Sequence, residues 1–134
     1  MAKAGDKFIV ELRETHLGWG THRYTNSRDI IHGEGYIPIP SKYAKLYQLY
    51  NSNKTSGLDI LGENIFNFVT NDDFLRGQLK SQGCKDSGDV FAKQFSVNDD
   101  LKALGKWYAH VNMQVGDKVE VLFTSPTDII IRKI

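Results

Sequence analysis

Short apolar runs separated by polar turns recur along the whole chain. Runs of this length, rich in β-branched and aromatic residues, are typical of β-strands. We expect strands at Phe8–Leu12, Tyr36–Ile39, Ile65–Val69, Phe74–Gln82, Val90–Val97, Lys118–Phe123 and Ile129–Ile134. The last two read as a hairpin that begins after Gly116-Asp117 and turns near Ser125-Pro126-Thr127. Many short strands with turns between them favour a barrel or a sandwich.

Two short helices are expected among these strands. Pro40 can open the first helix, because proline fits the first helical turn. A second helix is expected over Asp99–Leu104, with acidic residues in its first turn and Gly105 as its stop. The first helix carries a stripe at helical spacing, which we interpret as packing against one end of the barrel and not as a partner-binding surface: Tyr43, Leu46, Tyr47 and Tyr50. Two helices are too few for alternating βαβ units.

Two long polar segments interrupt the strand pattern. The first polar segment is Arg13–Glu34 and the second is Gln82–Asp89. A polar stretch as long as the first, inside one compact domain, is usually functional. Pro38 removes a ladder donor from the strand that follows the first segment, which predicts an edge position for that strand.

Length and charge set broad limits on the protein. The 134 residues predict a single domain over 1–134. Seventeen basic and sixteen acidic residues give a net charge of +1, which is weak support for nucleic-acid binding unless the basic residues cluster. The single cysteine, Cys84, favours a reducing, cytoplasmic location, and no apolar run reaches the ~20 residues of a membrane span.

Three runs of residues carry a family resemblance. Thr25-Asn26-Ser27-Arg28-Asp29-Ile30, the junction Tyr36–Ala44 and the later run Gly105–Asp117 are together similar to plant B3-type DNA-binding domains. The chain resembles the related recognition domains of restriction endonucleases at least as closely. The resemblance implies an all-β, seven-stranded open pseudobarrel with two short capping helices. It also implies two arms that grip the DNA major groove, one between the first two strands and one between the fourth and fifth.

The polar segments occupy the places of these arms and carry suitable side chains. Arginine can bond guanine and asparagine can bond adenine in the major groove, while hydroxyl and lysine groups hold phosphates. The first segment offers Arg23, Tyr24, Thr25, Asn26, Ser27 and Arg28. The second segment and its flanks offer Lys80, Gln82, Lys85, Asp86, Ser87, Lys93 and Gln94. Lys42, at the start of the first helix, is a further candidate phosphate contact.

The residues do not favour an enzyme, a metal site or a cofactor. Asp100-Leu101-Lys102 resembles part of a nuclease site, but helix capping explains it better. No Gly-Lys-Ser/Thr phosphate loop and no nucleophile elbow occur. The spacing of the four histidines matches no common zinc pattern: His16, His22, His32 and His110.

We therefore predict a module that binds double-stranded DNA in the major groove with sequence specificity. By resemblance, it recognises the target for a restriction-type endonuclease or a related prokaryotic DNA-binding protein, with any nuclease domain or subunit outside these residues. Two alternatives stay open. One is a barrel that binds a small ligand or a protein, and the other is a small hydrolase with its site in the histidine-rich first segment.

Overall fold

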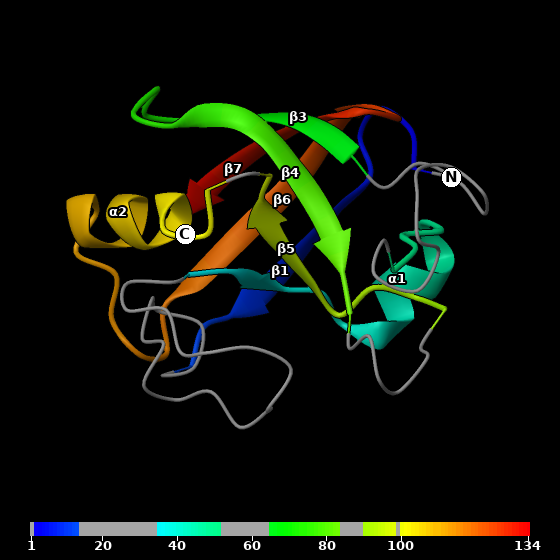
Figure 1. Ribbon diagram of the computed structural model, residues 1–134, viewed down its shortest axis with the longest axis horizontal. Helices are drawn as coiled ribbons and strands as arrows, with labels where there is room; N and C mark the ends of the chain where they lie inside the picture. Colours follow the sequence, from blue (N-terminus) through cyan, green and yellow to red (C-terminus); the bar gives the residue numbers. More distant parts are fainter. Residues whose placement is uncertain (1, 14–34, 52–64, 84–89, 99) are drawn as a thin grey trace.

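The protein is mostly β, with seven strands in one nearly closed, barrel-like sheet and two helices (Figure 1). The computed structural model describes residues 2–13, 35–51, 65–83, 90–98 and 100–134. The strands are β1 Lys7–Glu11, β2 Ile37–Pro38, β3 Ile65–Thr70, β4 Arg76–Gln82, β5 Gln94–Val97, β6 Lys118–Ser125 and β7 Asp128–Lys133. The helices are α1 Ser41–Leu46 and α2 Ala103–His110. The seven expected strands are therefore confirmed, together with the barrel-like sheet and the pair of helices.

The sheet has the order β1-β6-β7-β3-β4-β5-β2. All neighbours are antiparallel except β3 and β7, which run parallel. The two edges are β1 and β2, so Pro38 lies in an edge strand as expected. Helix α1 follows β2 in the chain and contacts the other edge, where the Tyr47 hydroxyl donates to the Lys7 carbonyl oxygen at 2.9 Å. It thereby connects the two edges of the sheet.

Side chains that alternate along the strands fill the interior. Phe66 of β3 points inward and makes edge-to-face contacts with Phe95 and Phe123, with ring centroids 5.7 and 5.9 Å apart. These rings come from β3, β5 and β6, so they join parts of the sheet that are not neighbours in its strand order. Trp107 of α2 is fully buried and belongs to the same core. Burial of such aromatic surface is the main stabilising contribution in a domain of this size.

The second helix differs from the sequence-based expectation. Helix α2 begins where we expected the helix to end, and Gly105 lies inside it. Tertiary packing of α2 overrides the low helix propensity of glycine. The backbone of Gly35 comes so close that a Cβ placed on it would lie 2.6 Å from the Gly105 nitrogen. Trp107 also lies on the buried face of the helix.

The tyrosine stripe of α1 follows the expectation only in part. Tyr43 stacks on Phe8 and Tyr47 is buried, so both pack against the barrel as predicted. Leu46 is 60% exposed, and its assignment to the core was wrong. Tyr50 lies beyond the end of the helix, and its ring stacks on Phe91 at 5.4 Å. The described helices are also too short and too polar to cross a membrane.

Candidate nucleic-acid interface

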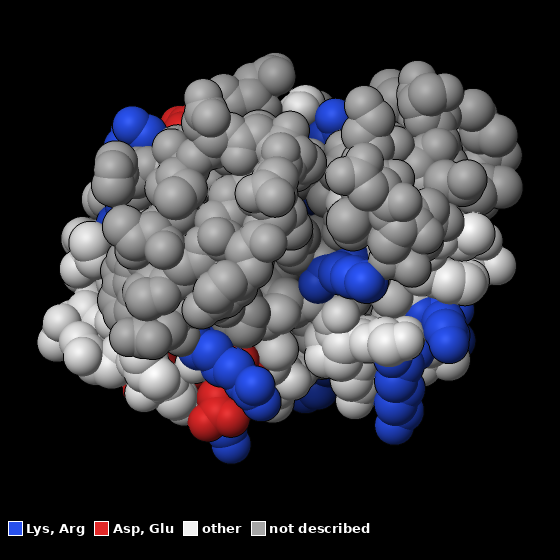
Figure 2. All heavy atoms as spheres, turned by 60° about the horizontal axis from the view of Figure 1, so that its bottom comes forward, with Lys and Arg blue, Asp and Glu red and all other residues white. Residues whose placement is uncertain are grey.

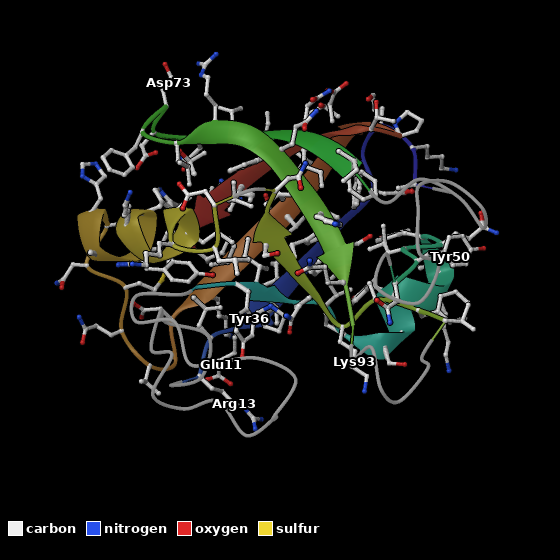
Figure 3. All side chains as sticks on the ribbon, viewed as in Figure 1. Glu11, Arg13, Tyr36, Tyr50, Asp73 and Lys93 are labelled. Atoms are coloured by element: carbon white, nitrogen blue, oxygen red, sulfur yellow. The ribbon has the colours of Figure 1, made fainter. Side chains whose placement is uncertain are left out.

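The two polar segments join the sheet at neighbouring strands. The first connects β1 to β2, and the second connects β4 to β5. Strand β2 pairs with β5, and Pro38 lies opposite Gln94, while Gln82 lies opposite Gln94 from the other side. Figure 3 shows Arg13, Tyr36 and Lys93 in the lower half of the molecule. The attachment points of both segments therefore lie on one side of the barrel.

The attachment points of the first segment are held by backbone hydrogen bonds. Leu12 donates its N–H to the Asp117 carbonyl at 2.8 Å and accepts from the Gly116 N–H at 2.9 Å. At the other attachment point, Gly35 donates to the Leu101 carbonyl at 3.0 Å. The turn before β6 and the approach to α2 thus fix where this segment begins and ends.

The outer face of β4 and β5 carries a row of polar side chains. Lys80 lies opposite Ser96 in the register of these strands, and directly opposite residues share one face of a sheet. The neighbouring side chain Leu79 points into the core. The Ser96 hydroxyl donates to Gln82 Oε1 at 2.6 Å, which orients the glutamine side chain. Lys80, Gln82 and Gln94 are all half-buried, so part of each side chain reaches the surface.

Acidic residues are unevenly distributed among the described residues of this near-neutral chain. Residues 35–51, 74–83 and 90–98 form β2, α1, β4, β5 and their flanks, and they contain no Asp or Glu. Their basic residues are Lys42, Lys45, Arg76, Lys80 and Lys93. Arg76 makes an ion pair with Asp73, which lies just before this part of the chain.

The described acidic residues lie elsewhere. They belong to the vicinity of β1, the β3–β4 turn, the approach to α2, and β6 and β7: Asp6, Glu11, Asp72, Asp73, Asp100, Asp117, Glu120 and Asp128. Figure 2 brings the lower edge forward, and the described surface at its lower right shows blue side chains without red ones. The described part of the sheet next to the second segment is therefore locally basic.

The structure brings five of the predicted site residues to this half of the molecule. Lys80, Gln82, Lys93 and Gln94 lie on β4, β5 and the stretch before β5. Exposed Lys42 lies on α1, with its Nζ 5.4 Å from the centroid of the Tyr43 ring. The other predicted site residues lie outside the described residues: Arg23, Tyr24, Thr25, Asn26, Ser27, Arg28, Lys85, Asp86 and Ser87.

Sequence reasoning missed Lys45 as a candidate. It is exposed on α1 and lies one helical turn from Lys42, so both ammonium groups belong to the same surface of the helix. The signal was present in the i, i+3 spacing of two lysines.

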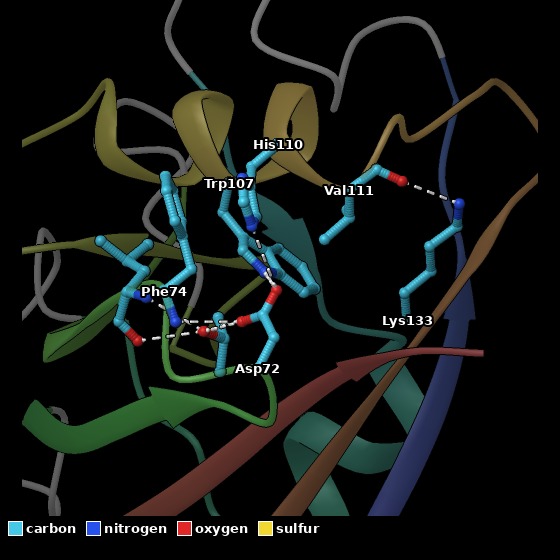
Figure 4. A network of polar contacts seen from close by, with 8 residues as sticks. Asp72, Phe74, Trp107, His110, Val111 and Lys133 are labelled. Carbon is cyan, nitrogen blue, oxygen red and sulfur yellow. Dashed lines mark hydrogen bonds and ion pairs between the residues drawn. The ribbon is translucent and has the colours of Figure 1, made fainter.

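A second polar network joins the β3–β4 turn to α2 (Figure 4). Asp72 Oδ2 accepts the indole N–H of Trp107 at 3.1 Å and lies 4.0 Å from His110 Nε2. Asp72 Oδ1 accepts the Thr70 hydroxyl at 2.6 Å, and this hydrogen bond is the main reason that the pKa of Asp72 lies below its ordinary value. The Phe74 ring stacks on His110 with centroids 3.9 Å apart. These contacts satisfy a buried indole and hold a turn, which is a structural role.

The same end of α2 is attached to β7. Lys133 Nζ donates to the Val111 carbonyl at 3.0 Å. Asp100 accepts the Lys102 backbone N–H at 3.1 Å in a local turn before α2. The N-cap of α2 is Lys102 and it makes no side-chain cap hydrogen bond, so the expectation that Asp100 caps the helix was wrong. Within the described ranges, no group of three or more His, Cys, Asp or Glu side chains could hold a metal ion.

Comparison of the chain with protein families, curated proteins and solved structures found no match. The fold and the surface described above therefore define a small, barrel-like β protein with one basic side.

Proposed function

We propose that this protein binds double-stranded DNA through the major groove with sequence specificity, as a B3-like pseudobarrel. The observation that carries the proposal is the uneven distribution of acidic residues among the described residues. A continuous part of the molecule, formed by β2, α1, β4 and β5, has basic residues and no acidic ones, although the whole chain has a net charge of only +1. Phosphate contacts supply much of the affinity in protein–DNA complexes and need such a surface.

The arrangement of the attachment points supports the same proposal. Gly35 ends the first segment, and Ile39, four residues later, donates its N–H to the Lys93 carbonyl beside the second segment at 2.7 Å. This contact places the end of the first segment beside the flank of the second, on the adjacent strands β2 and β5. Two polar segments attached next to each other in this way suit the two sides of one major groove.

The resemblance makes the proposal more specific. In this proposal the protein is the target-recognition module of a restriction-type endonuclease or of a related prokaryotic DNA-binding protein. Half-buried Gln82 and Gln94, with the asparagine and arginines of the first segment, read base edges, while Lys42, Lys80 and Lys93 hold phosphates. Any cleavage chemistry belongs to a partner domain or subunit.

Selection from random duplexes tests this function directly. Duplexes that carry a central random region are incubated with the protein, recovered and sequenced over several rounds. We expect one short motif to be enriched, and we expect a scrambled duplex of the same composition to bind at least about 10³-fold more weakly at physiological salt. Absence of any enriched motif, with affinity independent of salt, would contradict the proposal and favour the ligand- or protein-binding alternative.

Lysine variants test which surface meets the phosphates. Lys93→Ala and Lys80→Ala should each weaken binding to selected and scrambled duplexes alike, and each should reduce the slope of log K against log salt by about 0.9. Lys3→Ala is the matched control, because Lys3 is exposed near the start of β1, outside the acid-free ranges. Arg23→Ala and Lys85→Ala should also weaken binding, with little change in the free energy of unfolding. Equal slopes for the Lys93, Lys80 and Lys3 variants would rule out this surface.

A further inference from the structure

We infer that Asn51 is a positioning residue that holds both ends of the second polar segment in one orientation. Asn51 is completely buried and lies in the stretch that follows α1. Its side-chain Oδ1 accepts the N–H of Gly83 at 2.8 Å, and its own backbone N–H donates to the carbonyl of Val90 at 2.8 Å. Gly83 and Val90 are the last described residue before residues 84–89 and the first one after them. One residue therefore holds both ends.

Neighbouring contacts attach this connection firmly to the core. Tyr50 pairs with Phe91 in an isolated β-bridge, and their rings stack. The Ser81 hydroxyl donates to the Tyr50 carbonyl at 2.8 Å, and Ala92 donates its N–H to the Leu49 carbonyl at 2.8 Å. The stretch after α1 thus acts as a short extra strand beside the approach to β5. Its position is linked to α1, which carries Lys42 and Lys45.

Gly83 is part of the same arrangement. A Cβ placed on Gly83 would lie 2.9 Å from Asn51 Nδ2 and 3.1 Å from its Cγ. A methyl group at this position would therefore push the Asn51 side chain away from its hydrogen bond. Since the side chain is completely buried, it has little room to move elsewhere. The absence of a side chain at Gly83 is what lets Asn51 reach its backbone.

The consequence for recognition rests on the proposed function. Base reading requires donors and acceptors placed to a fraction of an ångström, whereas phosphate attraction tolerates larger displacements. Loss of the Asn51 connection should therefore reduce discrimination between sequences and leave the salt dependence unchanged. A lysine variant should instead reduce the salt dependence of binding and leave the discrimination between sequences unchanged. This difference separates a positioning residue from a residue that contacts DNA.

The first measurement does not involve DNA. Amide hydrogen exchange is followed in Asn51→Ala, with Thr70→Val as the control that removes a buried hydroxyl at the β3–β4 turn. Asn51→Ala should accelerate exchange of the Gly83 amide at least about tenfold, the effect of losing one hydrogen bond of ~1.4 kcal/mol. Thr70→Val should instead accelerate the Leu75 amide, which donates to Thr70 Oγ1 at 3.1 Å. An unchanged Gly83 amide in Asn51→Ala would overturn the inference.

The second measurement uses the duplex enriched from the random pool and a scrambled duplex. Asn51→Ala should lower the ratio of the two affinities about tenfold at a temperature where it is fully folded, with an unchanged salt slope. Gly83→Ala should do the same, and it replaces Asn51→Ala if that variant fails to fold. Thr70→Val should keep the parent ratio. If the variants of Asn51 and Gly83 also keep it, the inference is overturned.

The two proposals fail in different ways. A parent protein that prefers no duplex would contradict the proposed function, and the exchange rate of the Gly83 amide would then decide alone whether Asn51 holds the second segment. A parent that selects a motif, combined with variants that keep full discrimination, would leave the function standing and remove the role of Asn51.

Discussion

Gly35 lacks a side chain where the backbone of α2 passes close to it. A Cβ at this position would approach the Gly105 nitrogen to 2.6 Å and the Gly105 Cα to 3.0 Å. Both neighbours are backbone atoms of a helix, so they cannot move aside without moving the helix. The exit of the first polar segment is therefore placed by a contact between two glycines.

Replacing Gly35 by alanine should destabilise the protein. We expect Gly35→Ala to lower the free energy of unfolding by about 1–3 kcal/mol, the usual effect of overpacking a closely packed site. Gly77→Ala is the matched control, because the nearest atom to its added Cβ is a Phe68 ring carbon at 3.6 Å, an ordinary contact. Urea denaturation of the two variants gives the comparison. Equal stability of both would show that the backbones at Gly35 and Gly105 can separate without cost.

At the scale of elements, the β3–β4 turn and α2 form one unit. Asp72 of the turn contacts Thr70 at the end of β3, and it also contacts Trp107 and His110 of α2. The indole of Trp107 is completely buried, and its N–H needs an acceptor there. Asp72 provides that acceptor and also accepts the backbone N–H of Phe74 at 3.1 Å. The turn therefore supports the helix that contacts Gly35.

The Asp72 carboxylate should make the free energy of unfolding depend on pH in the acidic range. Its folded-state pKa is lowered, chiefly by the Thr70 hydroxyl, so its contribution is full above the unfolded-state pKa of about 3.9 and is lost as the pH falls through the lower folded value. Asp72→Asn should cost about 1–2 kcal/mol at pH 7 and flatten the loss of stability below about pH 4. Thermal unfolding between pH 2 and pH 7 measures both effects.

A second carboxylate also contributes to the loss of stability in acid. The pKa of Asp128 is also lowered, first by the Ser125 hydroxyl and then by the Asn67 amide. Asp128 therefore loses its contribution over the same acidic range, and Asp72→Asn should keep part of the acid sensitivity. A variant with the full acid sensitivity of the parent would show that Asp72 contributes nothing through its charge.

At the scale of the whole molecule, the net charge conceals an uneven distribution. The acid-free part of the sheet and α1 occupies one side, and the described acidic residues lie on the other elements. On the acidic strands, buried Glu120 accepts two hydrogen bonds from Arg132 at 3.1 and 3.2 Å, so charges of opposite sign offset each other there. If the protein binds DNA as proposed, we expect the attraction for the phosphates to come mainly from the acid-free part of the described residues.

Charge reversal at two matched lysines tests this expectation. Lys45→Glu and Lys3→Glu change the net charge equally, and both lysines are exposed. Lys45→Glu should weaken binding to a scrambled duplex about three- to tenfold at low salt, whereas Lys3→Glu should have a much smaller effect. Fluorescence anisotropy with a labelled duplex gives both affinities. Equal losses would mean that only net charge matters and that the basic side has no special role.

Much of the fold could be predicted because strand signals are local. Runs of β-branched and aromatic residues next to turn residues indicate three parts of the sheet: Phe8–Leu12, Ile65–Val69 and the closing hairpin. The position of α2 could not be predicted, since it depends on the contact of Gly105 with Gly35, seventy positions away. Leu46 was misassigned because the buried face of α1 and its end contains Ala44 and Tyr47, and Leu46 lies outside this face although it has helical spacing from Tyr43.

Only the polar segments and the basic side chains of the candidate site could be predicted from the sequence. Polar segments and basic side chains can be recognised in a sequence, and their attachment to β1, β2, β4 and β5 follows the expected order. The role of Asn51 could not be foreseen, because its two hydrogen-bonded partners are 32 and 39 positions away. DNA binding and its site residues stay predictions.

The parallel pairing of β3 with β7 governs when the barrel can close. β1, β6 and β7 form one block and β3, β4, β5 and β2 form the other, and within the sheet only this seam joins them. Thr70 of β3 pairs with Ile131 of β7, so these two strands can pair only after β7 has been synthesised. Such non-local pairing slows folding. During synthesis, β2, β3, β4 and β5 are therefore complete before the strands β6 and β7 are available to join them.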